Sequence, residues 1–197
     1  VEAGGGSMAL DKRTFRGRLE LIAGQGGGFT VVNRIPIEDY LKGMIGSEMS
    51  HAWPLEALKA QAVAARTYAV YQRFYGGKCH YHLESSVIDQ VYTGLQKEEI
   101  STIQAVADTA GEVVAYDGEP GLALFHACCG GETRDIAEVF GKPVPYLKPV
   151  KCGFCQACPL YRWKRGVPLS KIAEALKRQG MYAGAVDGIA SDERGRV

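Results

Sequence analysis

Glu48 is the residue of this sequence best placed for acid–base chemistry. The apolar residues before it recur at helical spacing, and they are Ile37, Tyr40, Leu41, Met44 and Ile45. Glu48 continues this series, so a helix that reaches it points the carboxylate where the apolar side chains point. Partial burial and the negative end of the helix dipole both disfavour the ionised form of such a carboxylate. We therefore expect Glu48 to keep a proton near neutral pH, as a general acid must.

The same segment allows a second interpretation, in which Glu48 is an ordinary solvated residue. Gly43 and Gly46 are poor helix formers, and a helix that ends at either of them leaves Glu48 in a loop. The spacing alone does not decide between the two. Glu38 and Asp39 lie more than two turns before Glu48, and we interpret both as surface residues.

Length, composition and charge limit the class of protein. The chain has 197 residues, of which 46% are hydrophobic, and this is enough for one domain with a real core. The formal net charge is +1, from 23 basic and 22 acidic residues, so electrostatics gives no reason to expect a nucleic-acid partner. No apolar run approaches the length of a transmembrane helix.

Helices and strands are predicted without regular alternation along the chain. Two hairpins are expected, from residues 15–22 with 28–35 and from residues 112–118 with 121–127. Helices are expected over residues 36–48, 54–74, 98–110 and 169–178, with a short strand pair after the last. This order predicts an α+β fold, a single mixed domain in which helices pack on antiparallel β-hairpins.

The helix that begins at Pro54 is rich in alanine, so its few polar side chains are conspicuous. Gln61 and Tyr68 share one face, and Arg66 lies on an adjacent face. A buried Gln or Arg side chain costs free energy unless it is paired. We expect the partners to be backbone carbonyls or a carboxylate such as Glu48, in a groove that binds a sugar or peptide. The alternative is that Arg66 lies on the solvent side.

Three long stretches carry a resemblance to a known family. They are "NRIPIEDYLKGMIGSEMSHAWPLEALKAQAVAARTYA", "DQVYTG" and "FHACCGGETRDIAEVFGKPVPYLKPV". Together with "CGFC" and "PLYRW" they resemble the stage II sporulation protein D family, also called the SpoIID/LytB domain. The likeness spans residues 14–178, which predicts an N-terminal extension over 1–13, a catalytic domain over 14–178 and a C-terminal tail over 179–197.

This resemblance implies a peptidoglycan lytic transglycosylase. Such enzymes cleave the β-1,4 bond between N-acetylmuramic acid and N-acetylglucosamine without water, because the muramic acid 6-hydroxyl attacks C1 and gives a 1,6-anhydro product. The family's catalytic glutamate falls on Glu48. The implied partner is the peptidoglycan glycan strand, and the implied location is outside the cytoplasm. LytB-type relatives are described as modifiers of a cell-wall amidase, so a non-catalytic wall-binding module or amidase activator is the alternative.

Other residues are expected to line the glycan groove. They are Gln61, Arg66, Tyr68, Gln90, Tyr92, His126, Gly130, Gly131 and Thr133. The paired glycines Gly130 and Gly131 suit a close approach of backbone to a sugar. A lone histidine at the end of a strand is more often a packing residue, so a packing role is the alternative to glycan binding for His126.

The cysteines predict a metal site. They are Cys79, Cys128, Cys129, Cys152, Cys155 and Cys158, and the last three have the spacing CxxCxxC, in which thiolates can turn toward one ion. The family often carries a cysteine before the paired glycines together with the later CxxC. The resemblance therefore points to Cys129, Cys152 and Cys155 as a cluster. From the spacing alone, Cys129 or Cys128 adds a ligand from the turn at the paired glycines, and Cys158 or a histidine is the fourth ligand of a structural zinc ion. Disulfides are the main alternative, and an iron–sulfur cluster is a further one.

One departure from the family concerns the loop before "QVY". Some members bind zinc there through a histidine and two cysteines. This sequence has Asp89 where a cysteine would be expected, so Cys79 with His80 or His82 is only an alternative metal site. No organic cofactor is expected.

Overall fold

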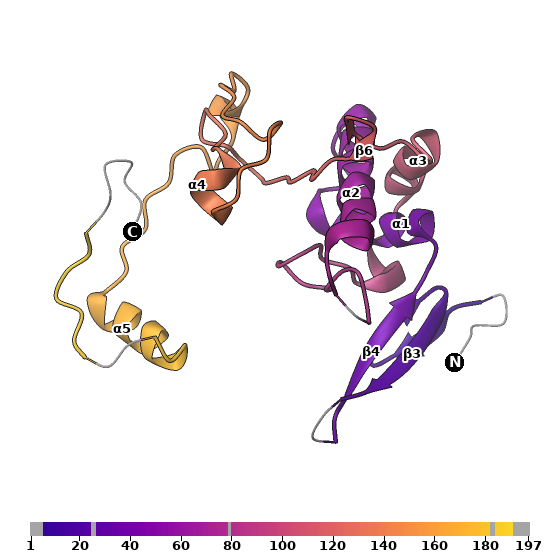
Figure 1. The fold of residues 1–197 in the computed structure, drawn as a ribbon, viewed down its shortest axis with the longest axis horizontal. Coiled ribbons are helices and arrows are strands. Elements are labelled where there is room, and N and C mark those ends of the chain that lie inside the picture. The colour runs from indigo at the N-terminus through magenta and orange to yellow at the C-terminus, as the bar shows by residue number, and fades with distance from the viewer. Residues whose placement is uncertain (1–5, 25–26, 79, 182–183, 191–197) are drawn as a thin grey trace. The chain divides into compact units, whose positions relative to one another are not determined.

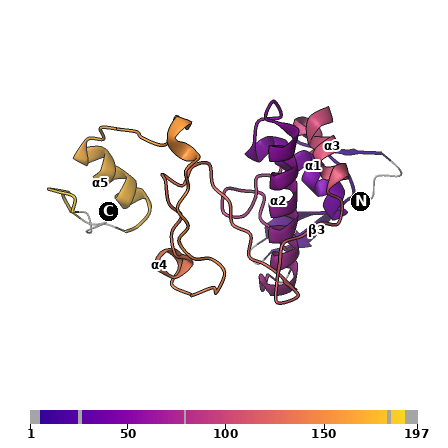
Figure 2. The ribbon, with the colours of Figure 1, turned by 90° about the horizontal axis from the view of Figure 1, so that it is seen from above.

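Helix α1 (Ile37–Glu48) packs against α2 (Leu55–Tyr75) and α3 (Ile100–Asp108) in the first part of the chain (Figures 1 and 2). The computed structural model describes residues 6–24, 27–78, 80–181 and 184–190. The chain divides into two compact units, residues 1–125 and residues 126–197, and each is described by itself.

Short antiparallel hairpins precede and follow these helices. The strands are β1 (Met8–Leu10), β2 (Arg13–Phe15), β3 (Arg18–Ala23), β4 (Phe29–Arg34), β5 (Ala115–Tyr116) and β6 (Glu119–Pro120). The strands form three separate pairs, β1 with β2, β3 with β4 and β5 with β6. In the ladder between β3 and β4, Leu21 lies opposite Val31. Asp117 and Gly118 join β5 to β6 with φ angles of 50° and 82°, the positive values that a tight hairpin turn requires.

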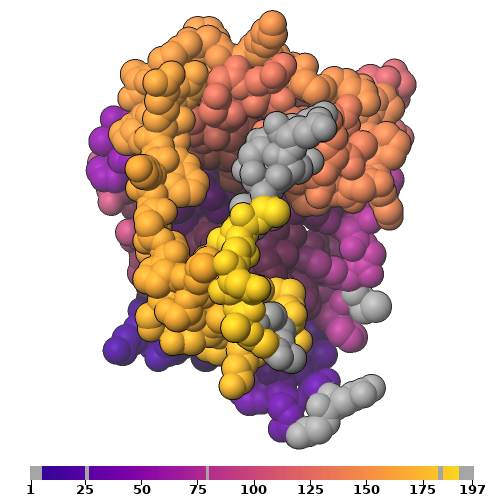
Figure 3. All heavy atoms as spheres, turned by 90° about the vertical axis from the view of Figure 1, so that its left-hand side faces the viewer, coloured from indigo at the N-terminus to yellow at the C-terminus, as the bar shows by residue number. Residues whose placement is uncertain are grey.

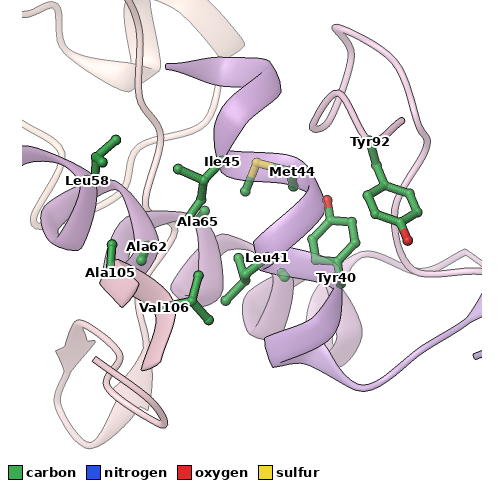
Figure 4. Close-up of a cluster of buried hydrophobic side chains, with 11 residues drawn as sticks. Tyr40, Leu41, Met44, Ile45, Leu58, Ala62, Ala65, Tyr92, Ala105 and Val106 are labelled. Carbon is green, nitrogen blue, oxygen red and sulfur yellow. The ribbon is translucent and has the colours of Figure 1, made fainter. Parts of the chain in front are cut away.

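The core of the first unit lies between α1, α2 and α3 (Figure 4). Leu41, Met44 and Ile45 of α1 are 0% exposed, and Leu58 of α2 is equally enclosed. Full burial of such a side chain stabilises the fold by roughly 1.5–3 kcal/mol. The apolar stripe predicted for this helix is therefore confirmed, and the helix runs as far as Glu48.

Gly43 and Gly46 do not end α1, because their lack of a side chain admits the 3₁₀ helix η1 (Gly94–Lys97). A Cβ atom on Gly43 would lie 2.3 Å from the carbonyl oxygen of Gly94. A Cβ atom on Gly46 would lie 2.2 Å from the carbonyl oxygen of Lys97. This close packing outweighs the low helix propensity of glycine. The alternative in which the helix ends at either glycine is wrong.

The second unit has little buried apolar surface. Its helices are α4 (Ile136–Phe140), the 3₁₀ helix η2 (Cys155–Ala157) and α5 (Leu169–Arg178). Ile136, at 6% exposure, is the one buried hydrophobic residue among the described residues of this unit. Figure 3 shows this unit in orange to yellow. So small a core calls for another source of stability.

The α+β class is confirmed, but two predicted strand pairs differ from the structure. Residues 121–127 form no strand: the ladder of the second hairpin ends at Pro120, beyond which the Gly121 amide donates one hydrogen bond of 2.9 Å to the Val114 carbonyl. Residues 184–190, after α5, also carry no strand. The predicted domain boundaries at residues 13 and 178 stay predictions.

Within the described residues, no helix is both long enough and apolar enough to cross a membrane.

Candidate functional site

Glu48 is the last residue of α1, and its side chain lies at the surface. Its Oε1 accepts a hydrogen bond of 2.7 Å from the backbone amide of Val91. The expected burial of this carboxylate is wrong. The buried stripe ends at Ile45, and the chain turns to an extended conformation at Met49, which leaves the last helical turn open to solvent.

An open depression lies along the segment that follows Glu48. It has a volume of about 450 Å³ and is lined by His51, Leu55, Glu99, Ile100, Ser101 and Gln104. The Ser101 hydroxyl donates a hydrogen bond of 2.8 Å to the carbonyl of His51 and so fixes this segment on α3. None of the residues predicted to line the glycan groove contributes to this depression.

Gln90 anchors the loop that presents the Val91 amide. Its side chain is 0% exposed. Its Oε1 accepts a hydrogen bond of 2.8 Å from the Tyr40 hydroxyl, and its Nε2 donates one of 3.2 Å to the Ala65 carbonyl. The loop is thereby tied to both α1 and α2. The prediction that Gln90 lines a groove is wrong, because its amide is enclosed and both ends of it are occupied.

Tyr92 and Tyr68 are also packing residues, each 7% exposed. The ring of Tyr92 lies beside that of Tyr40 on α1 (Figure 4), and the two ring centroids are 5.1 Å apart. Burial raises the pKa of Tyr92 to about 12. Burial, assisted by a hydrogen bond of 2.8 Å to Asp89, raises the pKa of Tyr68 to about 12 as well. Both hydroxyls therefore stay protonated, and neither ring forms the wall of a groove.

Asp89 serves as a second anchor of the same loop. Its carboxylate accepts hydrogen bonds from the Tyr68 hydroxyl, the Lys78 ammonium and, at 2.7 Å, the Glu84 amide. Burial raises the pKa of Asp89, but these hydrogen bonds outweigh burial and hold it below the usual 3.8. His80 and His82, the alternative metal ligands, are exposed, and Cys79 lies outside the described residues.

Arg66 is enclosed in the first unit, with 1% of its surface exposed. Its Nε and Nη2 donate to the two oxygens of Glu38 at 2.9 and 2.8 Å, and its Nη1 donates to the Glu112 carbonyl at 3.1 Å. Burial raises the pKa of Glu38, but the bonds from Arg66 and the Gly111 amide outweigh it and keep the pKa below the usual 4.5. Arg66 is a structural residue and does not line a groove. Its carboxylate partner is Glu38, which we interpreted as a surface residue, and not Glu48.

Gln61 differs from the other predicted groove residues on α2. Its Nε2 is buried and has no hydrogen-bond partner within the described residues. A buried donor without a partner costs about 1–3 kcal/mol. Gln61 therefore stays a candidate for contact with a ligand.

Three cysteines of the second unit lie close enough to hold a metal ion. The sulfur atoms of Cys129, Cys152 and Cys155 are all within 4.8 Å of one another. The Cys155 sulfur lies 3.1 Å from that of Cys129 and 3.4 Å from that of Cys152. Thiolates on one tetrahedral zinc ion, at Zn–S distances of about 2.3 Å, are about 3.8 Å apart. Small side-chain movements would therefore bring this group around an ion.

Cys158, the predicted fourth ligand, lies outside this group of three. Its thiol contacts that of Cys128, which also contacts Cys155. The hydrogen bond from Cys129 is the main cause that lowers the pKa of Cys155 to about 7, and the same contact raises the pKa of Cys129 to about 11. The arrangement favours a thiolate at Cys155, the form in which cysteine binds metals. None of these five described cysteines forms a disulfide in the structure.

The remaining predicted residues belong to the second unit. His126 is exposed, and Gly130 and Gly131 have φ angles of 70° and 108°. Thr133 forms a backbone hydrogen bond with Val150, and its hydroxyl accepts another from the Val150 amide at 2.8 Å. A role of these residues in binding a glycan stays a prediction.

Comparison with known proteins bears on the first unit. The sequence pattern of the family described as SpoIID, stage II sporulation protein, matches residues 25–116. The chain belongs to the SpoIID family. The SpoIID match includes α1, α2 and the loop that carries Val91, and it ends before the cysteine group.

Relatives of the SpoIID chain extend the likeness. An uncharacterized protein of Brachyspira hyodysenteriae is 40% identical over 154 residues, 78% of this chain and 42% of the relative. Stage II sporulation protein D of Bacillus subtilis is 32% identical over 146 residues, 66% of this chain and 43% of the relative. The amidase enhancer of Bacillus subtilis is 40% identical over 107 residues, 54% of this chain and 14% of the relative. The chain thus spans less than half the length of these relatives.

The structure adds site residues that the sequence did not indicate. Val91 acts through its backbone amide, which leaves no signal in residue type. Glu38 carries the counter-charge of Arg66, although the sequence indicated no partner for it.

Proposed function

We propose that this chain is a lytic transglycosylase that cleaves peptidoglycan glycan strands, with Glu48 as general acid and base. Membership of the SpoIID family supports a role at the cell wall. The proposed reaction cleaves the bond between N-acetylmuramic acid and N-acetylglucosamine and leaves a 1,6-anhydro product. This substrate lies outside the cytoplasm, which is the proposed location of the chain.

The observation that carries the proposal is the setting of Glu48. Its carboxylate is exposed to a large substrate, yet the Val91 amide holds one of its oxygens at 2.7 Å. A glycan strand bound over Glu48 excludes water from it, and loss of water favours the protonated carboxyl.

One carboxyl group suffices for this reaction. Hydrolases of glycosidic bonds generally use two, the second as nucleophile or to activate water. Here Glu48 protonates the bridging oxygen as its bond to C1 breaks. The 6-hydroxyl oxygen of the same muramic acid bonds to C1, and its proton passes to Glu48. The carboxylates of Glu38 and Asp89 are paired with Arg66 and Lys78, so neither is free to act as the acid.

The test uses purified glycan strands without stem peptides. Wild type is expected to release 1,6-anhydromuramic products detected by mass spectrometry. Glu48→Gln is expected to be at least about 100-fold slower, because general acid catalysis contributes about that much. Glu56→Gln changes a glutamate whose side chain is 83% exposed on α2, and it should match wild type. An inactive wild type, or full activity of Glu48→Gln, would exclude this mechanism.

We further infer that the cysteine group holds a structural zinc ion. Three sulfur ligands on two loops, together with a unit that buries little apolar surface, support this assignment. Zinc would link the two loops through Cys129, Cys152 and Cys155. Cys158 was the predicted fourth ligand, and Cys128, which contacts both Cys155 and Cys158, competes for that place.

A second function is favoured by one of the relatives. The likeness to an amidase enhancer supports a role in which this chain stimulates a cell-wall amidase without cleaving glycan. Glu48→Gln separates the two functions. A transglycosylase loses its activity with this change, whereas a binding module keeps its effect on amidase turnover.

A further inference from the structure

We propose that Gln90 is a positioning residue, which holds the Val91 amide on Oε1 of Glu48 so that Oε2 carries the proton toward the substrate. This role rests on the proposed function of Glu48 as general acid. It gives the two oxygens of one carboxyl group different tasks.

The first step is the rigidity of the loop around Val91. Gln90 is bound to α1 through Tyr40 and to α2 through Ala65. On the other side, Tyr92 is 7% exposed, and its carbonyl accepts a hydrogen bond of 2.5 Å from the Ser85 hydroxyl. Val91 therefore lies between two buried residues, and its amide cannot move unless one of them moves.

The second step concerns the carboxyl group of Glu48. An oxygen that accepts a hydrogen bond from an N–H faces a donor and cannot point a proton in the same direction. The Val91 amide therefore assigns Oε1 as an acceptor and leaves Oε2 as the oxygen that gives and takes the proton. The same contact limits the rotamers of an exposed, flexible side chain, so that less entropy is lost when substrate binds.

The third step is the requirement for glutamine. The Tyr40 hydroxyl is a donor and needs an acceptor, while the Ala65 carbonyl needs a donor. One neutral amide supplies both. Gln90→Met keeps the length of the side chain and removes both hydrogen bonds.

Thr67→Val is the matched control. Thr67 is 0% exposed on α2, and its hydroxyl also makes two hydrogen bonds, to the Val63 carbonyl at 2.6 Å and from the Val114 amide at 2.9 Å. Loss of the Thr67 hydroxyl lowers stability in α2, the helix to which Gln90 is bound through Ala65, without changing the loop at Val91.

The test measures amide hydrogen exchange at Val91 by NMR, and glycan cleavage, in the 197-residue chain. Gln90→Met should make amide exchange at Val91 about tenfold faster, which is the effect of one lost hydrogen bond. The exchange rate should then equal that in Glu48→Ala, the reference variant that removes the acceptor of this amide. It should lower kcat by about 10- to 100-fold, as expected for a misplaced catalytic group, with KM changed less than about twofold. Thr67→Val should keep wild-type Val91 exchange and kcat below its unfolding temperature.

Three results would overturn this role of Gln90. They are unchanged Val91 exchange in Gln90→Met, faster exchange with wild-type kcat, and an equal loss of kcat in Thr67→Val. If wild type cleaves no glycan, the proposed function fails. Val91 exchange then still decides whether Gln90 holds that amide on Glu48.

Discussion

Replacing Glu38 by Gln is expected to lower the free energy of unfolding of the first unit by about 3 kcal/mol. Glu38 places both carboxylate oxygens on the guanidinium of Arg66, which is 1% exposed. The change leaves this cation buried without its counter-charge. Removal of one partner of a buried ion pair costs about 3–5 kcal/mol, and the lower end applies because 33% of the Glu38 side chain is exposed.

The size of this effect depends on pH, with a sign set by the lowered pKa of Glu38. In the folded chain the pKa lies below the usual 4.5, so the ionised carboxylate stabilises the fold at pH values above the unfolded-state pKa. That stabilisation is lost as the pH falls through the folded-state pKa. Wild type and Glu38→Gln should therefore differ fully at pH 7 and converge only as the pH falls through the folded-state pKa of Glu38, which lies below 4.5.

The assay is guanidinium unfolding at pH 7 and at pH 3, followed by tryptophan fluorescence. The two tryptophans, Trp53 and Trp163, lie in different units, so a Trp163→Phe background makes Trp53 report on the first unit alone. Glu56→Gln is the control, since its exposed pair with Lys59 is worth less than about 1 kcal/mol. If Glu38→Gln unfolds at the same midpoint as this control, Arg66 does not depend on Glu38.

Two further predictions concern the close packing on α1 and the thiol group. Gly43→Ala should gain about 1 kcal/mol of helix propensity. It should nevertheless destabilise the first unit by about 1–3 kcal/mol, because the new Cβ lies 2.3 Å from the Gly94 carbonyl oxygen. A rise in the unfolding midpoint would contradict this prediction. Elemental analysis should find one zinc ion per chain. Cys129→Ser or a strong chelator should remove this ion and make residues 126–178 sensitive to protease. If these residues stay resistant to protease after the metal is lost, zinc does not stabilise this unit.

The local pattern of the sequence was enough to predict the main helices. The apolar stripe of α1 follows the helical repeat, and a residue's place in that repeat depends only on its neighbours in the chain. The same reasoning placed α5 at Leu169–Arg178, where the structure has it. The spacing of Cys152 and Cys155 likewise predicted part of the cysteine group, because two side chains only three residues apart can turn toward one point.

Tertiary contacts decided which of the predicted site residues can meet a ligand. Gln90, Tyr92, Tyr68 and Arg66 were all expected to line the glycan groove, but each is enclosed by segments distant in sequence. Residue type alone does not distinguish a polar side chain that binds a ligand from one that ties two elements together.

What the sequence by itself determined is therefore the helical position of Glu48, the proposed acid. What only the tertiary structure decided is its surroundings. Arg66 donates a hydrogen bond to Glu38, which lies 28 residues away in the sequence. Glu48 accepts one from the amide of Val91, which lies 43 residues away. Helix formation is governed by contacts within a few residues, whereas burial and hydrogen-bond partners depend on how distant segments meet. Glu48 is exposed because the core ends one turn before it, and no periodicity in α1 alone encodes where that core ends.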